Sequence, residues 1–253
     1  MNVLLRALAA ERIKLHHTLA LWMCLIAPGV VVGLQVLQLL VQDLSRREAL
    51  DGPAAWQFFV QSSLALWALL MLPLYVTLQS ALLAGLEHGD RQWKHLLALP
   101  LPRWVHYLSK LLTLAAMLAA ALLILALLIV LGGAVLMWAR PELGIRGAPP
   151  LGLLSSKLAL IFLTSLAMVA IHTFIAIRWA SFTVAVASGM SATVMGFLIG
   201  QSAQFSHWYP WSMTIQVLAK DPKHLGFVLI ASSLIAITLT LYALWDFARR
   251  EFG

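Results

Sequence analysis

The sequence predicts an all-α membrane protein with six transmembrane helices, and three observations lead to this fold class. Of the 253 residues, 62% are hydrophobic and only 11% are charged, whereas a soluble domain usually carries about 25% charged residues. The apolar residues form six long runs, each near the roughly 20 residues that a helix needs to cross a bilayer. The segments between the runs are too short to fold separately, so residues 1–253 form a single transmembrane domain.

The first predicted element is an amphipathic helix over residues 1–18. Leu4, Leu8 and Leu15 share one stripe of this helix, with Glu11 close to it, and Glu11 and Lys14 are neighbours three residues apart. A helix with one apolar face and charges on the other typically lies in the plane of the membrane interface. We therefore expect an interfacial helix that leads into the first span.

Six spans follow, each an apolar run bounded by polar or charged residues. Pro73 falls inside the second run, and a proline there removes a backbone hydrogen bond, so we expect this span to be kinked. The predicted bounds are Leu19–Val41, Phe58–Leu83, Leu111–Trp138, Leu153–Ile177, Phe182–Gln201 and Leu225–Trp245.

Lysine and arginine are distributed unevenly between the two sides of these spans. Ten of the 17 fall on the side of the two termini, the segment 87–110 and the turn at Arg178. Short cytoplasmic loops carry the excess of Lys and Arg in membrane proteins. We therefore predict that both termini are cytoplasmic. The formal charge of +7 belongs to these flanking residues and does not indicate nucleic-acid binding.

The cytoplasmic segment 87–110 is predicted to contain a short surface helix. Its charges are spaced four residues apart with the acid first, the order that stabilises a helix. An apolar patch beside these charges indicates contact with lipid or protein, because a solvated loop needs only polar residues. Pro100 ends the helix. The residues assigned to this surface are Glu87, Asp90, Arg91, Trp93, Lys94, Leu96 and Leu97.

The outer loop 202–224 is rich in aromatic residues. Trp208, Tyr209 and Trp211 surround Pro210, and Trp and Tyr are enriched where a membrane protein meets the interface. We expect these side chains in an aromatic belt at the outer surface. A short interfacial or re-entrant helix is expected before the sixth span.

Polar residues inside the spans have two interpretations. Polar groups are costly in lipid, so they usually face other helices or a water-filled path. They either form interhelical hydrogen bonds or contact a substrate, and the sequence leaves both open. The candidates are Gln35 and Gln38 in the first span, Thr77 and Gln79 in the second, and His172 in the fourth.

The fifth span carries small residues at helical spacing. Small residues let two helix backbones approach closely in lipid. This row fits either tight packing within the chain or an interface between two chains. Its members are Ser181, Ala185, Gly189, Gly196 and Gly200.

No catalytic, cofactor-binding or metal-binding motif is found in the sequence. It contains no H-E-x-x-H, no G-x-S-x-G and no G-x-x-x-x-G-K-[ST]. Without a P-loop the chain has no nucleotide site and is not expected to be an enzyme, so any ATP-driven work requires another polypeptide. A self-powered secondary transporter is an alternative, although no chain of acids runs along the spans. A membrane-embedded enzyme is a further alternative without a catalytic constellation to support it.

Taken together, these features resemble the ABC-2-type permease family, the membrane subunits of ABC exporters. The resemblance rests on the N-terminal AERIKLHHT, on the six spans, on the WYPWS stretch and on a loose pattern in the segment 87–110. The chain is similar above all to small six-span permeases linked to bacitracin and lantibiotic-type peptide resistance or immunity. The residues that carry the loose pattern are Glu87, Trp93, Lys94, Leu96, Leu97, Pro100, Arg103, Ser109 and Lys110.

The resemblance implies a role in a bacterial plasma membrane. The helix with Glu11 and Lys14 and the helix around Glu87–Leu99 would dock onto a cytoplasmic ATPase subunit, present in two copies. ATP and Mg²⁺ would bind only in that subunit. A second permease chain, identical or related, would pair with this one within the membrane lipid. The substrate would be an amphipathic molecule such as a peptide antibiotic.

Overall fold

The computed structural model describes residues 3–42, 52–88, 102–219 and 223–249, and every regular element in these ranges is a helix. The elements are α1 (Val3–Leu15), α2 (Leu19–Val41), α3 (Gly52–Leu66), the π-helical turn η1 (Trp67–Met71), α4 (Leu72–His88), α6 (Arg103–Ala139), the 3₁₀ turn η2 (Pro141–Leu143), α7 (Leu151–Arg178), α8 (Phe182–Gly200), α9 (Pro210–Gln216) and α10 (Leu225–Arg249).

Six of the described helices are long and apolar enough to cross a membrane, which confirms the predicted fold class. Each corresponds to one predicted span, with α3, η1 and α4 forming the second, and the fifth prediction runs one residue past the end of α8. The second and third extend well beyond their apolar runs, because each has 37 residues and is therefore about 55 Å long. A bilayer core is only about 30 Å thick, so the charged ends of α4 and α6 project beyond it.

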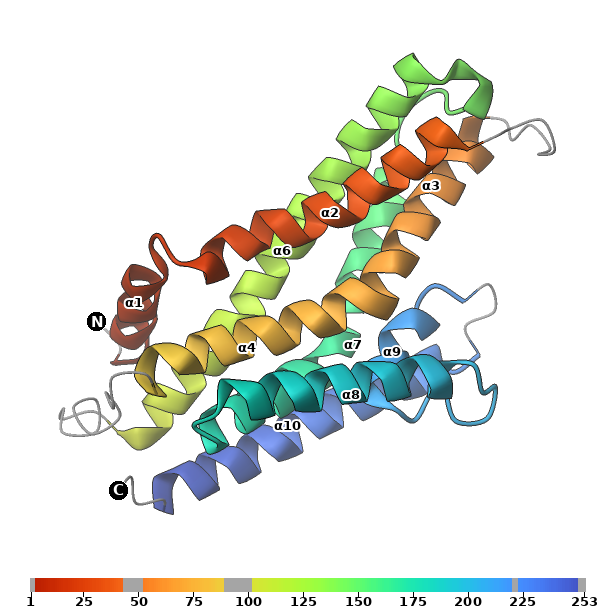
Figure 1. Ribbon diagram of the computed structural model, residues 1–253. Coiled ribbons are helices and arrows are strands. Elements are labelled where there is room, and N and C mark those ends of the chain that lie inside the picture. Colours follow the sequence, from red (N-terminus) through yellow and green to blue (C-terminus); the bar gives the residue numbers. More distant parts are fainter. Residues whose placement is uncertain (1–2, 43–51, 89–101, 220–222, 250–253) are drawn as a thin grey trace.

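Both ends of the described chain lie at the same end of the molecule (Figure 1). The last turn of α4 and the first turn of α6 also lie there, and α1 packs on α6. α2 runs along α6, α10 runs along α7, and α4 contacts both α7 and α8. At the opposite end, α2, α3 and α6 diverge from α8 and α10.

The expected break in the second span takes the form of the π-helical turn η1. Pro73 has no backbone N–H and its ring would clash with the carbonyl four residues earlier in a regular helix. The wider turn at Trp67–Met71 ends two residues before Pro73, and the helix bends between α3 and α4 (Figure 1). Thr214 of α9 donates a hydrogen bond to the Ala68 carbonyl at 3.2 Å, so α9 stabilises the irregular turn.

The expected short helix before the sixth span is α9, which starts at Pro210. Proline suits the first helical position, where its missing N–H has no partner in any case. The position predicted for Trp211 is wrong, because its side chain is only 8% exposed and packs in the core. Trp208 is 62% exposed, as an interfacial residue should be. Whether α9 is re-entrant stays a prediction.

Small residues of α8 pack closely against other helices of the same chain, and an interface between two chains stays a prediction. A Cβ added to Gly189 would lie 2.7 Å from the Thr77 Cβ of α4 and closer still to its hydroxyl. A Cβ on Gly196 would lie 2.7 Å from the Cβ of Trp211. Close approach of α4 and α9 therefore accounts for this row, whose remaining members are the buried Ala185, Gly200 near Ser212, and the N-cap Ser181.

Candidate functional site

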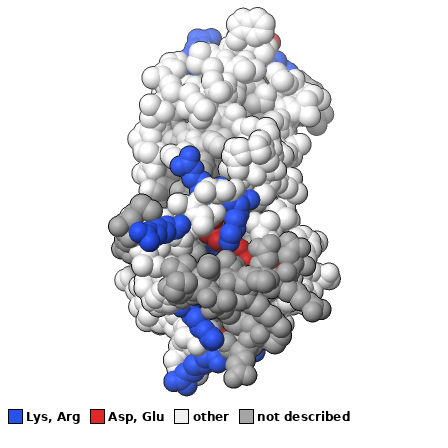
Figure 2. Space-filling view, turned by 90° about the vertical axis from the view of Figure 1, so that its left-hand side faces the viewer, with Lys and Arg blue, Asp and Glu red and all other residues white. Residues whose placement is uncertain are grey.

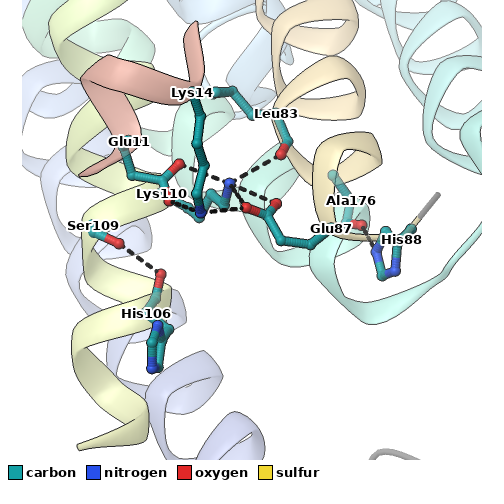
Figure 3. A network of polar contacts seen from close by, with 9 residues as sticks. All are labelled: Glu11, Lys14, Leu83, Glu87, His88, His106, Ser109, Lys110 and Ala176. Atoms are coloured by element: carbon teal, nitrogen blue, oxygen red, sulfur yellow. Dashed lines mark hydrogen bonds and ion pairs between the residues drawn. The ribbon is translucent and has the colours of Figure 1, made fainter. Parts of the chain in front are cut away.

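Four charged side chains from three helices converge at the end of the molecule that carries both termini (Figure 3). The Lys110 Nζ of α6 lies 2.7 Å from Glu11 Oε2 of α1 and 2.6 Å from the Glu87 carboxylate of α4. The Lys14 Nζ of α1 lies 2.9 Å from Oε1 of both glutamates. Each lysine therefore bridges both carboxylates, and we call Glu11, Lys14, Glu87 and Lys110 the ionic cluster.

Three of the four residues of the ionic cluster are buried, and the cluster is balanced in charge. Glu87 is 0% exposed, Lys110 4% and Glu11 5%. Moving ions out of water is costly unless they are paired and their remaining hydrogen-bonding groups are satisfied. Two ammonium groups face two carboxylates here, and Lys110 also donates to the Leu83 carbonyl at 3.1 Å. All three donors of the Lys110 ammonium are thus used.

The cluster alters the role that the sequence assigned to two glutamates. Glu11 and Glu87 were expected on an exposed docking surface, but they are buried and bond to lysines of their own chain. They hold α1, α4 and α6 together instead of presenting charge to a partner. Lys14 remains partly exposed. The other docking candidates, Asp90, Arg91, Trp93, Lys94, Leu96 and Leu97, lie outside the described residues.

Lys110 is the functional candidate that sequence reasoning placed in no site, because it was named only as a flanking charge and as part of the family pattern. The clue was Glu11, an acid beside the leucine stripe of α1. In the structure Leu15 is buried on that face together with Glu11. A charged residue on the packed face of a helix requires an opposite charge on the neighbouring element. Lys110, at the start of an apolar run, is such a charge.

Two histidines lie near the cluster without joining it (Figure 3). His88 lies 3.0 Å from the Ala176 carbonyl through its Nε2, and because a carbonyl only accepts, this nitrogen carries the proton. The bond ties the end of α4 to α7. His106 is 8% exposed, and its own carbonyl accepts a bond from Ser109 at 3.0 Å. In the part of the chain that the structure describes, no group of three or more His, Cys, Asp or Glu is placed to hold a metal ion.

Basic side chains surround the buried cluster on the surface of this end (Figure 2). Among the described residues, the only acid of this end that is not buried is Asp246, which lies 3.8 Å from Arg178. The described surface is therefore positive, as the cytoplasmic side of a membrane protein usually is. We call it the basic end; its surface arginines are Arg6, Arg12, Arg103, Arg178 and Arg249.

The pairing changes the acidity of the two cluster residues on α1. Burial raises the pKa of Glu11, but the ammonium groups of Lys110 and Lys14 outweigh this effect, so the pKa falls below its ordinary value of 4.5. Burial lowers the pKa of Lys14, but its bonds to Glu11 and Glu87 outweigh it, so this pKa rises above its ordinary value of 10.5. Both residues are therefore held in their charged forms.

A first prediction concerns the pH dependence of this stabilisation. Because the Glu11 pKa is lowered, ionised Glu11 contributes its full stabilisation above pH 4.5, and this contribution is lost as the pH falls through the lowered pKa. A raised Lys14 pKa stabilises below pH 10.5, and the effect disappears as the pH rises through the raised value. We expect Glu11→Gln to cost about 2 kcal/mol at neutral pH, as for a bond to a charged group.

Thermal unfolding of the purified protein in detergent across a pH series measures this effect. The difference between wild type and Glu11→Gln should shrink in acid, below the ordinary pKa of Glu11. The difference between wild type and Lys14→Met should shrink at strongly alkaline pH, where Lys14 loses its charge, and also in acid, where its partner Glu11 is protonated. A Glu11→Gln difference that stays constant into acid would contradict the pairing.

The polar residues inside the spans mostly bond to neighbouring helices. Gln35 donates to the Ser62 carbonyl at 3.3 Å, and Gln79 donates to the Ala20 carbonyl at 2.8 Å. The Thr77 hydroxyl donates to the Pro73 carbonyl at 2.8 Å, so it accepts from the His172 Nε2 at 3.2 Å. Each of these four residues therefore has at least one partner within the chain. Gln38 is exposed, and for all five residues contact with a substrate stays a prediction.

Comparison with known proteins identifies one family. A family model for the ABC-2 family transporter protein matches residues 7–200, a range that runs from α1 through α8. No curated protein matches the chain, and no solved structure does. The matched range contains all four residues of the ionic cluster.

Proposed function

The chain belongs to the ABC-2 transporter family, and from this premise we propose that it is the permease of an exporter that moves an amphipathic molecule out of the membrane or the cytoplasm. As a member of this family it is a multi-pass membrane protein and the permease subunit of an ABC transporter, with ATP hydrolysis in a separate subunit. The proposal concerns the direction of transport, the substrate and the docking surface.

The ionic cluster is the observation that supports the docking surface best. Lys110 and Glu87 lie on either side of the segment 89–101, which the family resemblance implies would dock onto the ATPase. Glu11 joins α1 to Lys110, and Lys14 joins α1 to Glu87. A movement of this segment or of α1 would therefore reach α4 and α6 together. Since these two helices belong to the second and third spans, movement at the ATPase would be passed into the membrane.

The basic end supports the proposed orientation. Its surface arginines match the excess of positive charge that cytoplasmic surfaces carry, and both ends of the described chain lie there. We propose that this end faces the cytoplasm of a bacterium and binds the ATPase, in two copies. Pairing with a second permease chain, identical or related, belongs to the same proposal.

The substrate class rests on composition and on the resemblance to peptide-resistance permeases. The six predicted spans contain a single charged residue between them, Lys157, so they offer few charges to carry an ion or a strongly polar solute. An amphipathic molecule that partitions into the bilayer is compatible with such walls. We propose a peptide antibiotic or a molecule of similar chemistry.

A prediction on Trp93 tests the docking surface. This residue lies outside the described range, and the sequence places it in the apolar patch between the second and third spans. We expect Trp93→Ala to weaken binding of the ATPase about thirtyfold, because a buried tryptophan at an interface typically contributes about 2 kcal/mol. Co-purification in mild detergent and substrate-stimulated ATPase activity measure the loss.

Trp138→Ala is the matched control, because Trp138 is 87% exposed at the opposite end of α6. It should leave both measurements unchanged. Wild-type ATPase stimulation in Trp93→Ala would remove the docking role from this segment. If an ion gradient drove substrate flux into vesicles that contain this chain alone, the chain would be a secondary transporter and the exporter proposal would be wrong.

A further inference from the structure

A pocket of about 250 Å³ lies between α4 and α8, close to the basic end. Its inner wall is built from alanines, and Ala81, Ala84 and Ala185 are each at most 3% exposed. Alanine side chains are too short to fill the space between two helices, so a hollow remains. Gly85 extends it, since a Cβ added there would meet nothing within 4 Å.

The rim of the pocket differs from its wall. Trp179 and Phe182, at the turn between α7 and α8, are 46% and 52% exposed. The Arg178 guanidinium lies 5.7 Å from the Trp179 ring centre. The His88 imidazole also lines the pocket and bonds to the α7 backbone. Tryptophan and arginine side chains together are typical of the level of the lipid head groups.

We propose that this pocket binds the apolar tail of the transported amphipathic molecule as it leaves the inner leaflet. The alanine wall accepts the tail, while Arg178 and His88 lie where the polar head would remain in contact with water. The size fits, because a dry cavity of about 150 Å³ already accepts benzene. The identification of the occupant as the transported molecule rests on the proposed function, whereas the existence of the pocket does not.

The test uses the complete transporter, permease with ATPase, in lipid nanodiscs. The probe is a single-chain phosphocholine that carries a diazirine in its alkyl chain. After irradiation, peptide mapping should find the label on residues 81–88 and 176–185. Gly85→Leu places a side chain in the open space and should lower this labelling about tenfold, the loss expected when about two methylene groups can no longer be buried.

Gly226→Leu is the matched control, because Gly226 also has nothing within 4 Å of an added Cβ and lies at the opposite end of the molecule. It should leave the labelling unchanged. Gly85→Ala is the second variant in case the leucine prevents folding. It favours the helix, and its methyl group should give a smaller loss of label in a protein that still binds the ATPase.

Three outcomes decide the proposal. Loss of label together with loss of ATP-driven transport in Gly85→Leu supports it. Unchanged labelling in Gly85→Leu overturns it. Loss of label with unchanged transport also overturns it, because the occupant is then a bilayer lipid. Labelling does not require ATP, so it can be measured even if the wild type does not export. A wild type that is labelled but does not export would overturn the proposed function and leave the pocket in place.

Discussion

Replacing Lys110 with methionine is expected to destabilise the folded protein by about 3–5 kcal/mol, the usual cost of removing one partner from a buried ion pair. Lys110 is 4% exposed, and its ammonium contacts both Glu11 and Glu87. Methionine keeps a similar volume but leaves two buried carboxylates with only Lys14 between them. For a chain of this size the midpoint of thermal unfolding should fall by about 10 °C.

A second substitution separates charge from packing in this prediction. Lys110→Met combined with Glu87→Gln leaves one carboxylate, Glu11, with one ammonium, Lys14, and should recover a large part of the lost stability. Lys157→Met is the matched control, since Lys157 is a partly buried lysine that donates to the Val217 carbonyl at 2.6 Å. It should cost less than Lys110→Met. Equal midpoints for wild type and Lys110→Met would show that the cluster does not stabilise α1 on α4 and α6.

The loss should also reach function, because the cluster joins the helices beside the predicted docking segment. We expect Lys110→Met to lower transport even under conditions where the protein remains folded. ATP hydrolysis, which takes place in the partner subunit, should persist without stimulation by substrate.

The six spans were predictable because their pattern is local. An apolar run of sufficient length dictates a helix in lipid, where every backbone N–H and C=O must be satisfied within the segment. The break near Pro73 was predictable for the same reason, since the missing N–H belongs to the residue itself. The helix ends were less predictable, because α4 and α6 continue through charged turns that hydropathy excludes.

The ionic cluster shows what spacing along the chain does not reveal. The Glu11–Lys14 pair, three residues apart on one helix, is present in the structure at 2.9 Å. The bond between Glu11 and Lys110 joins residues 99 positions apart. That partnership depends on how α1 packs against α6, so only the acid beside the apolar stripe of α1 pointed to it.

The small residues of α8 illustrate the same difference. Their spacing predicts a face that approaches another helix closely, and the structure contains such an approach. The spacing alone does not indicate whether the neighbouring helix belongs to the same chain. In the structure Gly189 faces Thr77 and Gly196 faces Trp211. Thr77 lies on α4, far from α8 in the sequence, and Trp211 lies on α9, which follows α8.

Replacing Gly189 with leucine is therefore expected to destabilise the single chain by more than about 3 kcal/mol, above the usual cost of overpacking a core. The Thr77 side chain cannot turn away freely, because its hydroxyl donates to the Pro73 carbonyl and accepts from His172. α8 would have to move away from α4. Thermal unfolding in detergent measures the loss, and Gly29→Leu in α2 is the matched control, since a Cβ there meets nothing within 4 Å.

The milder Gly189→Ala distinguishes packing within the chain from an interface between chains. An added methyl group overlaps the Thr77 side chain, so Gly189→Ala should cost about 1–3 kcal/mol, and Thr77→Gly in the same chain should restore part of the loss by removing the overlapping atoms. An interface between two chains predicts a different result: the fraction of paired permease would fall while the unfolding midpoint of the single chain stayed the same. Because Thr77 lies on α4 of the same chain, rescue by Thr77→Gly is the outcome that the geometry requires.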